Sequence, residues 1–147
     1  MRSLEIAAVL LLAAVAPAAA LEPAGFMSGP EIDALVRGQE FAGEFEDGTP
    51  WREAYRADGT SDYESRGERW AGDWHVSGEM FCTFYRGVTS GGCWYVRQVS
   101  DNCYHFFIAG FGVDEPTLNR SAEDREKWYA RGYRKNAGST CPSAGVS

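Results

Sequence analysis

The sequence predicts a mostly β fold: an antiparallel meander of eight strands that closes into a small up-and-down barrel, preceded by one short helix. Two observations predict it. From residue 40 onward, short runs of aromatic and β-branched residues alternate with Gly, Asp, Asn and Ser at close, regular intervals. Closure of such a meander removes the unpaired edges that an open sheet would expose, which favours a barrel.

The N-terminal residues 1–20 have the pattern of a secretion signal. An apolar stretch from Ile6 to Val15 is followed by the small residues that signal peptidases accept, which predicts cleavage after Ala20. This stretch is shorter than the roughly 20 residues that a membrane-spanning helix needs. We therefore expect an exported protein of the bacterial periplasm or the medium, with no membrane span in the mature chain. A retained membrane anchor is the alternative.

Residues 21–39 are expected to form an N-terminal extension with a short helix. Ser28 can cap it, Pro30 suits its first turn, Glu31 completes a capping box and Gly38 ends it. A helix of about two turns is not stable alone, so it should plug or cover apolar surface. Its apolar face consists of Ile32, Leu35 and Val36.

The barrel domain is expected over residues 40–136. Asp47-Gly48, Asp58-Gly59, Ser77-Gly78 and Asp101-Asn102 have the chemistry of tight hairpin turns. A helical turn is expected from Ser121 to Lys127. The predicted strands are Glu40–Glu46, Pro50–Ala57, Thr60–Arg66, Arg69–Val76, Glu79–Arg86, Gly92–Val99, Cys103–Phe111 and Trp128–Arg134, the last of which could also be helical.

The four cysteines predict two disulfides, because an even number in a small exported domain is typical of such bridges. Of the three possible pairings we favour Cys82 with Cys93, across one hairpin, and Cys103 with Cys141. The second bridge would tie the tail, residues 137–147, back to the barrel. A zinc site is the competing interpretation, but the long spacings lack the short ligand pairs of structural zinc sites.

Charge and motif content exclude several classes of function. A formal net charge of −7 disfavours binding to nucleic acid or to an anionic membrane surface. Asp73, His75 and Ser77 alternate along one predicted strand, but alternate residues lie about 7 Å apart, beyond hydrogen-bonding distance. We expect these three side chains at the surface and a structural role for His105. The sequence therefore predicts no cofactor and no metal, and it favours a non-catalytic protein.

A carboxylate site is a further hypothesis. Glu44 and Glu46, with Glu53 on the next predicted strand, could together serve acid-base chemistry or bind calcium. The alternative is that they are ordinary surface residues of an acidic protein.

Aromatic residues make up 14% of the chain and indicate where a ligand could bind. Strand alternation places Trp51 and Tyr55 on one face, and Trp70 and Trp74 on one face of another strand. These inward rings either fill the barrel as a core or line a pocket that is open at one end. In the second case they would hold a small apolar or aromatic ligand.

The opposite faces of several strands also carry rings, including Phe84, Tyr95 and Phe107. An outward aromatic surface must be covered by the N-terminal helix, by the C-terminal segment or by another protein. The alternative function is therefore a protein-interaction module, such as an inhibitor or an envelope-assembly factor.

The segment from Gly59 to Val96 carries Gly72-Asp73-Trp74 followed by Cys82 and by Cys93-Trp94-Tyr95-Val96. In this pattern it resembles small exported bacterial proteins of uncharacterised function. The resemblance implies a hairpin-rich domain with a Cys82–Cys93 bridge and implies no catalytic residues. Gly-x-Trp is also similar to a signature of lipocalin and avidin barrels, where it lies on the first strand, whereas here it lies on the fourth.

Overall fold

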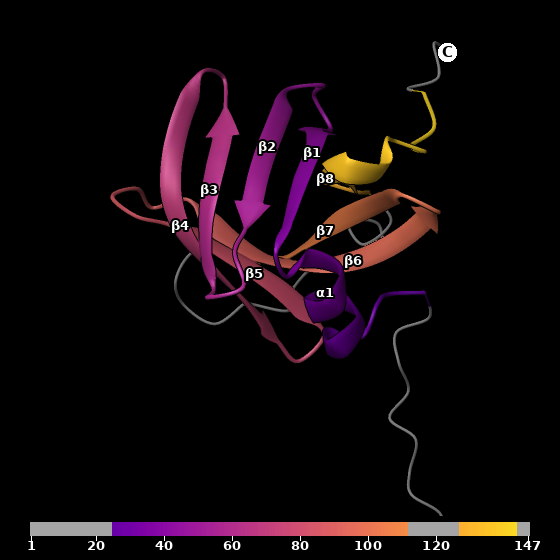
Figure 1. Ribbon diagram of the computed structural model, residues 1–147, viewed down its shortest axis with the longest axis horizontal. Helices are drawn as coiled ribbons and strands as arrows, with labels where there is room; N and C mark the ends of the chain where they lie inside the picture. Colours follow the sequence, from indigo (N-terminus) through magenta and orange to yellow (C-terminus); the bar gives the residue numbers. More distant parts are fainter. Residues whose placement is uncertain (1–24, 112–126, 144–147) are drawn as a thin grey trace, which may run out of the picture.

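The computed structural model describes residues 25–111 and 127–143. The predicted secretion signal and most of the helical turn expected after Ser121 lie outside these ranges. Within them the chain forms one short helix, then the strands of the barrel, then a 3-10 helix (Figure 1). The elements are α1 (Gly29–Val36), β1 (Gln39–Phe45), β2 (Pro50–Tyr55), β3 (Thr60–Ser65), β4 (Glu68–Ser77), β5 (Met80–Tyr85), β6 (Gly91–Ser100), β7 (Cys103–Phe111), β8 (Ala130–Arg134) and η2 (Lys135–Ala137).

The strands form a closed barrel in which each strand pairs with its neighbour in sequence and β8 pairs with β1. All pairings are antiparallel. The predicted eight-stranded up-and-down barrel with a preceding helix is thus confirmed. The strand interpretation of the last predicted element is confirmed as well, over Ala130–Arg134.

The Asp-Gly turns form as predicted. Gly48 and Gly59 have φ values of +81° and +88°, in the left-handed region that glycine tolerates. Asp47 and Asp58 each accept a hydrogen bond, of 2.9 Å in both cases, from the backbone N–H two residues further on. These local bonds keep the hairpins short and fix the register of the strands that they join.

Helix α1 covers one end of the barrel, the end toward which β2 points (Figure 1). The Ser28 N–H donates to Glu31 Oε2 at 2.8 Å, as the predicted capping box requires. Ile32, Leu35 and Val36 are buried in one cluster with rings of the barrel interior. The predicted role of this short helix as a plug is therefore confirmed.

Alternation places the large side chains of the strands inside the barrel. One cluster joins the α1 residues to the inward rings of several strands, among them Phe41, Trp51, Tyr55, Trp74, Phe81 and Phe106. The Trp51 ring lies so close to the wall that a Cβ built on Gly132 would be 2.8 Å from it. Glycine at position 132 thus lets β8 approach this ring.

The outward rings of β6 and β7 are partly covered by the segment that precedes α1. Phe26 packs on Tyr95 and on Phe107, with ring centroids 5.3 Å apart in both pairs. The Arg97 guanidinium lies over the Phe26 and Phe107 rings. Of the predicted covers of this face, the helix itself is not one, since α1 closes the barrel end.

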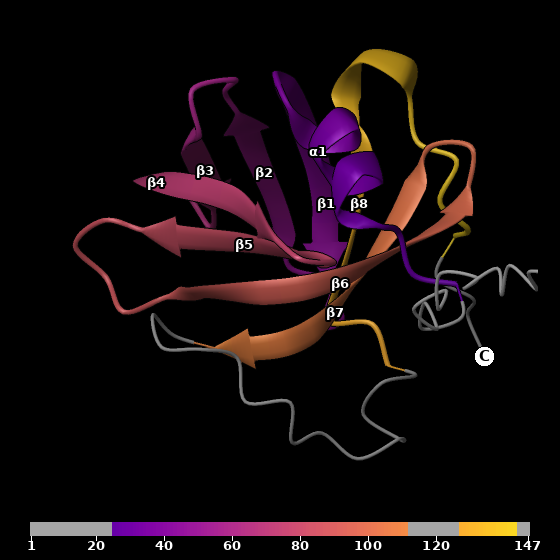
Figure 2. The same ribbon diagram turned by 90° about the horizontal axis from the view of Figure 1, so that it is seen from below.

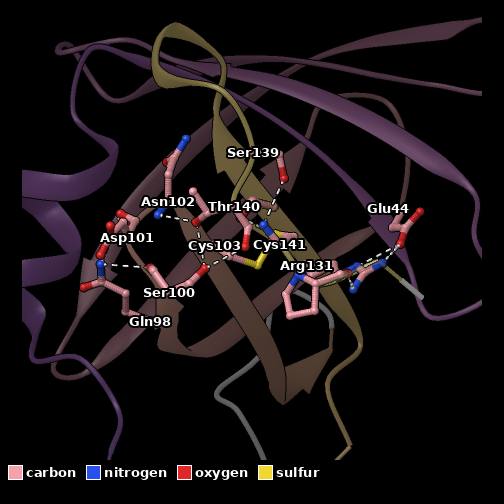
Figure 3. Close-up of a disulfide and its surroundings, with 12 residues drawn as sticks. Glu44, Gln98, Ser100, Asp101, Asn102, Cys103, Arg131, Ser139, Thr140 and Cys141 are labelled. Carbon is pink, nitrogen blue, oxygen red and sulfur yellow. Dashed lines mark hydrogen bonds and ion pairs between the residues drawn. A yellow bond between two sulfur atoms is a disulfide. The ribbon is translucent and has the colours of Figure 1, made fainter. Parts of the chain in front are cut away.

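Both predicted disulfides are present. Cys82–Cys93 joins direct register partners on β5 and β6, and Cys103–Cys141 ties the C-terminal segment to the start of β7. Around the second bridge, Thr140 contacts Ser100 and Asn102 through hydrogen bonds (Figure 3). Two disulfides fit an oxidising extracellular or periplasmic environment. In the described ranges, no helix has both the length and the apolar character that crossing a membrane requires.

Candidate binding site in the open half of the barrel

The end of the barrel under α1 is packed. Trp74, one of the predicted ligand-binding residues, is 4% exposed, and its Nε1–H donates to the Arg56 carbonyl at 2.8 Å. The Arg37 guanidinium lies over its ring, 5.1 Å from the ring centroid. The Trp74 ring thus has its polar atom satisfied and its face covered, as a core residue does.

At the opposite end the inward rings are only partly buried and pack on one another. Tyr63 stacks on Trp70 and on Tyr85, with centroid distances of 5.6 Å and 4.7 Å. Across the opening, Trp94 stacks on Tyr129 at 5.4 Å, and Phe45 contacts Tyr129 edge to face. We call these six rings the aromatic cup: Phe45, Tyr63, Trp70, Tyr85, Trp94 and Tyr129.

Two hollows adjoin the aromatic cup. An open depression of about 480 Å³ has Tyr63, Trp70, Phe45 and Tyr129 in its wall. A small cavity of about 50 Å³ lies further inside, with Phe45 and Tyr129 again in its wall and Trp51 and Tyr55 beside them. The cavity has room for a group the size of a few water molecules. A larger ligand would therefore insert one small group and leave the rest of its body in the depression.

The predicted ligand-binding residues are thus divided between the two halves of the barrel. Trp51 and Tyr55 line the cavity, and Trp70 lines the depression. Trp74 lies in neither, because it packs under α1. The two interpretations of the inward rings, a core or a pocket, apply to opposite ends of the same barrel. Figure 2 views the strands from the side on which α1 lies.

A buried carboxyl group lies beside the cavity. Glu53 is 3% exposed and lies between Trp51 and Tyr55 on the inward face of β2. Its Oε2 accepts hydrogen bonds from the hydroxyls of Tyr55, at 3.0 Å, and of Tyr85, at 2.9 Å. Its Oε1 is buried and accepts no hydrogen bond of normal geometry. Both donating tyrosines line the cavity, so the carboxyl group is one hydrogen bond away from it.

Burial has the largest effect on the pKa of Glu53. Loss of hydration raises the pKa of Glu53 to about 7, although the hydroxyls of Ser61, Tyr85 and Tyr55 partly offset that effect. The pKa values of Tyr55 and Tyr85 are raised well above their ordinary range by burial and by the nearby carboxylate. Glu53 is therefore the group of this set that changes charge near neutral pH.

Gly72 provides the space that Tyr85 occupies. A Cβ at this position would be 2.8 Å from the Tyr85 ring and 2.9 Å from Ser61 Oγ. The first residue of the Gly-x-Trp pattern thus allows the Tyr85 ring to cross β4 toward Glu53.

The hypothesis of a carboxylate site formed by Glu44, Glu46 and Glu53 is wrong, because the three side chains do not come together. Glu44 points outward and pairs with Arg131, whereas Glu46 is exposed beyond the end of β1 and Glu53 faces the interior. Strand parity separates the three, because Glu53 is paired with inward Phe41 and Glu44 with Pro50. Alternation with Trp51 and Tyr55 was the signal that could have placed Glu53 inside.

His75 lies on the outer surface, as the sequence predicts, and His105 is partly buried on the outward face of β7. Asp73, His75 and Ser77 are exposed on β4. His105 packs against Phe107 and Trp128, and its pKa is lowered by burial and by the charges of Arg131 and Arg97. Among residues 25–111 and 127–143, no three His, Cys, Asp or Glu side chains gather as metal ligands would.

Fold and site together define a helix-plugged, disulfide-linked β-barrel with one open, aromatic end. Comparison with protein-family models and with curated proteins finds no match to this chain.

Proposed function

We propose that this chain is a non-catalytic, exported binding module that holds a small apolar or aromatic ligand at the open end of its barrel. The observation that carries the proposal is the aromatic cup, whose inward rings remain partly exposed around a depression while the other barrel end is plugged. Flat ring faces bury large apolar area and favour stacked or edge-on contact with a second ring.

The way in which the cup is built supports a preformed site. Tyr63, Trp70 and Tyr85 come from adjacent strands of a closed sheet and hold one another by stacking. Rigid strands fix their positions, so little conformational freedom remains to be lost on binding. The residues that we propose to contact the ligand are Trp51, Tyr55, Tyr63 and Trp70.

The alternative, a protein-interaction module with an outward aromatic surface, has less support. In the part of the chain that the structure describes, the exposed large hydrophobic side chains are Val88 and Val99, not aromatic rings. Phe26 already packs on the outward rings Tyr95 and Phe107. An interaction surface would be expected to leave such rings accessible.

Binding of a neutral fluorescent probe, N-phenyl-1-naphthylamine, tests the proposal. We expect saturable fluorescence enhancement by the oxidised protein and at least about tenfold weaker binding by Trp70→Ala, a loss of about 1.4 kcal/mol. Trp128→Ala is the matched control, because this tryptophan packs on His105 outside the barrel. Equal binding by both variants and the parent protein would contradict the proposed site.

A native mass spectrum of protein purified from the compartment to which its own cells export it tests the same proposal without a chosen probe. We expect a retained small molecule that is lost in Trp70→Ala. A stoichiometric protein partner without a small molecule would instead favour the interaction module.

A further inference from the structure

A buried carboxyl group without a basic partner, Glu53, lies at the base of the proposed site. The Tyr55 and Tyr85 hydroxyls both donate to Oε2 of Glu53, and the Ser61 hydroxyl also lowers the pKa of the carboxyl group, so its neighbours are neutral hydroxyls. Each ion pair of the described residues joins other side chains, and none includes Glu53. A buried carboxylate in this condition is stabilised by any cation that can reach it.

We infer that the ligand carries an organic ammonium group, which enters the small cavity lined by Tyr55 and Tyr85, the two tyrosines that hydrogen-bond to Glu53, while its apolar or aromatic body lies in the aromatic cup. This inference deepens the proposed function and rests on it.

The size of the cavity fits such a group. Its volume of about 50 Å³ is too small for an aromatic ring but admits a group of ammonium size. The hydroxyls of Thr83, Tyr55 and Tyr85 are in or next to its wall, where they can accept hydrogen bonds from N–H groups. An ammonium group has three such donors and needs acceptors of this kind.

The aromatic cup favours a cation for a second reason. The faces of tyrosine and tryptophan rings carry partial negative charge and attract cations within about 6 Å of the ring centroid. Tyr63 and Trp70 lie in the wall of the depression, which shares Phe45 and Tyr129 with the wall of the cavity. A cation that passes these rings is therefore stabilised before it reaches the cavity.

The rim adds a third, longer-range contribution. Glu46, Asp47 and Glu68 line the depression, against a single basic residue, Arg66, which lies 3.4 Å from Asp47. The rim is thus acidic overall, in a chain whose formal net charge is −7. Such a field concentrates cations at the opening and repels anions.

The inference predicts a dependence on pH. The titratable groups that face Glu53 are Tyr55 from β2, Tyr63 from β3 and Tyr85 from β5, whereas β4 contributes Gly72. The pKa of each of these tyrosines is raised, so all three stay neutral near pH 7. Because the pKa of Glu53 is about 7, its carboxylate forms between pH 6 and 8. Cation binding should strengthen over that interval.

Calorimetric titration with two probes of the same shape tests this inference. 2-Phenylethylamine carries the ammonium group at both pH values, and 2-phenylethanol has a neutral hydroxyl in its place. At pH 8 we expect the amine to bind at least about tenfold more tightly than the alcohol, and we expect this preference to shrink at pH 6. Glu53→Gln should abolish both the preference and its pH dependence.

Glu40→Gln is the matched control, since Glu40 pairs with Lys135 on the outer surface and should leave binding unchanged. Circular dichroism establishes that each variant is folded before titration. Equal affinity for the two probes, or an amine preference that survives in Glu53→Gln, would overturn the ammonium inference and leave the proposed binding function intact. Binding of neither probe would overturn both.

Discussion

The Tyr85 hydroxyl donates a 2.9 Å hydrogen bond to Glu53 Oε2 across the barrel interior, although the two residues are 32 positions apart in sequence. This bond links β5 to β2 without passing through the strands between them. It also fixes the orientation of the carboxyl group beside the cavity.

Removal of this bond should act mainly on the ionised form of Glu53. We expect Tyr85→Phe to destabilise the protein by about 1.5 to 3 kcal/mol at pH 8, because hydrogen bonds to charged groups contribute that much. At pH 5, where the carboxyl group is protonated, the loss should be smaller. Denaturant unfolding at the two pH values measures both. Tyr133→Phe, on the outer face of β8, is the control, and an equal loss at both pH values would argue against this assignment.

Stability should fall as the solution becomes more alkaline. The pKa of Glu53 in the folded state is about 7, above its ordinary value of 4.5. The contribution of Glu53 to the free energy of unfolding is therefore full below pH 4.5 and is lost as pH rises through 7. The difference corresponds to about 3 kcal/mol at alkaline pH. Glu53→Gln should remove this loss, so that urea unfolding shows the variant to be the more stable protein at pH 8.5. A parent protein with unchanged stability from pH 5 to 8.5 would contradict the burial of this carboxyl group.

Two tryptophans of the same strand should respond differently to truncation. Trp74→Ala leaves a cavity under α1 and breaks the Nε1–H bond to the Arg56 carbonyl, so we expect a loss of about 3 to 5 kcal/mol. Trp70→Ala removes a partly buried ring from the aromatic cup and should cost less stability while weakening probe binding. Thermal denaturation with both disulfides intact compares the two. A small loss for Trp74→Ala would mean that the plugged end is not packed.

The disulfides should be visible in a non-reduced tryptic map. Cleavage after Arg86 and Arg97 separates Cys82, Cys93 and Cys103 into different peptides. The expected linked pairs are residues 70–86 with 87–97, and 98–120 with 136–147. Loss of the Cys103–Cys141 bridge should cost about 4 kcal/mol, against about 3 kcal/mol for Cys82–Cys93, because it closes the longer loop. Two or more alkylatable thiols in the native oxidised protein would refute the pairing.

Local chemistry explains why most of the fold could be predicted. Asp47 and Asp58 bond their own turns, and the residues between the turns alternate between interior and exterior. Cys82 and Cys93 become register partners once their hairpin forms. Each of these features depends on residues close in sequence, which is why the sequence pattern carries them.

The candidate site could be predicted only in part. Alternation identified the inward faces of Trp51, Tyr55, Trp70 and Trp74, but it does not show along the barrel axis which of them a helix will cover. The position of α1 against β4 and β5 separates Trp74 from the other three. The same alternation could have placed Glu53 on the inward face, but the prediction grouped it with Glu44 and Glu46. The role of Glu53 depends on partners that its sequence neighbours do not reveal.

The sequence by itself determined the strands, their hairpins, the helix and the disulfide pattern, since these follow from turn residues, strand alternation and cysteine spacing. Only the tertiary structure decided which end of the barrel is filled and which is open, and that Tyr55 and Tyr85 meet at a buried carboxyl group. Closure of β8 onto β1 brings together strands from opposite ends of the domain. The burial of Glu53 and its pKa depend on many such long-range contacts together, and a local sequence pattern does not specify them.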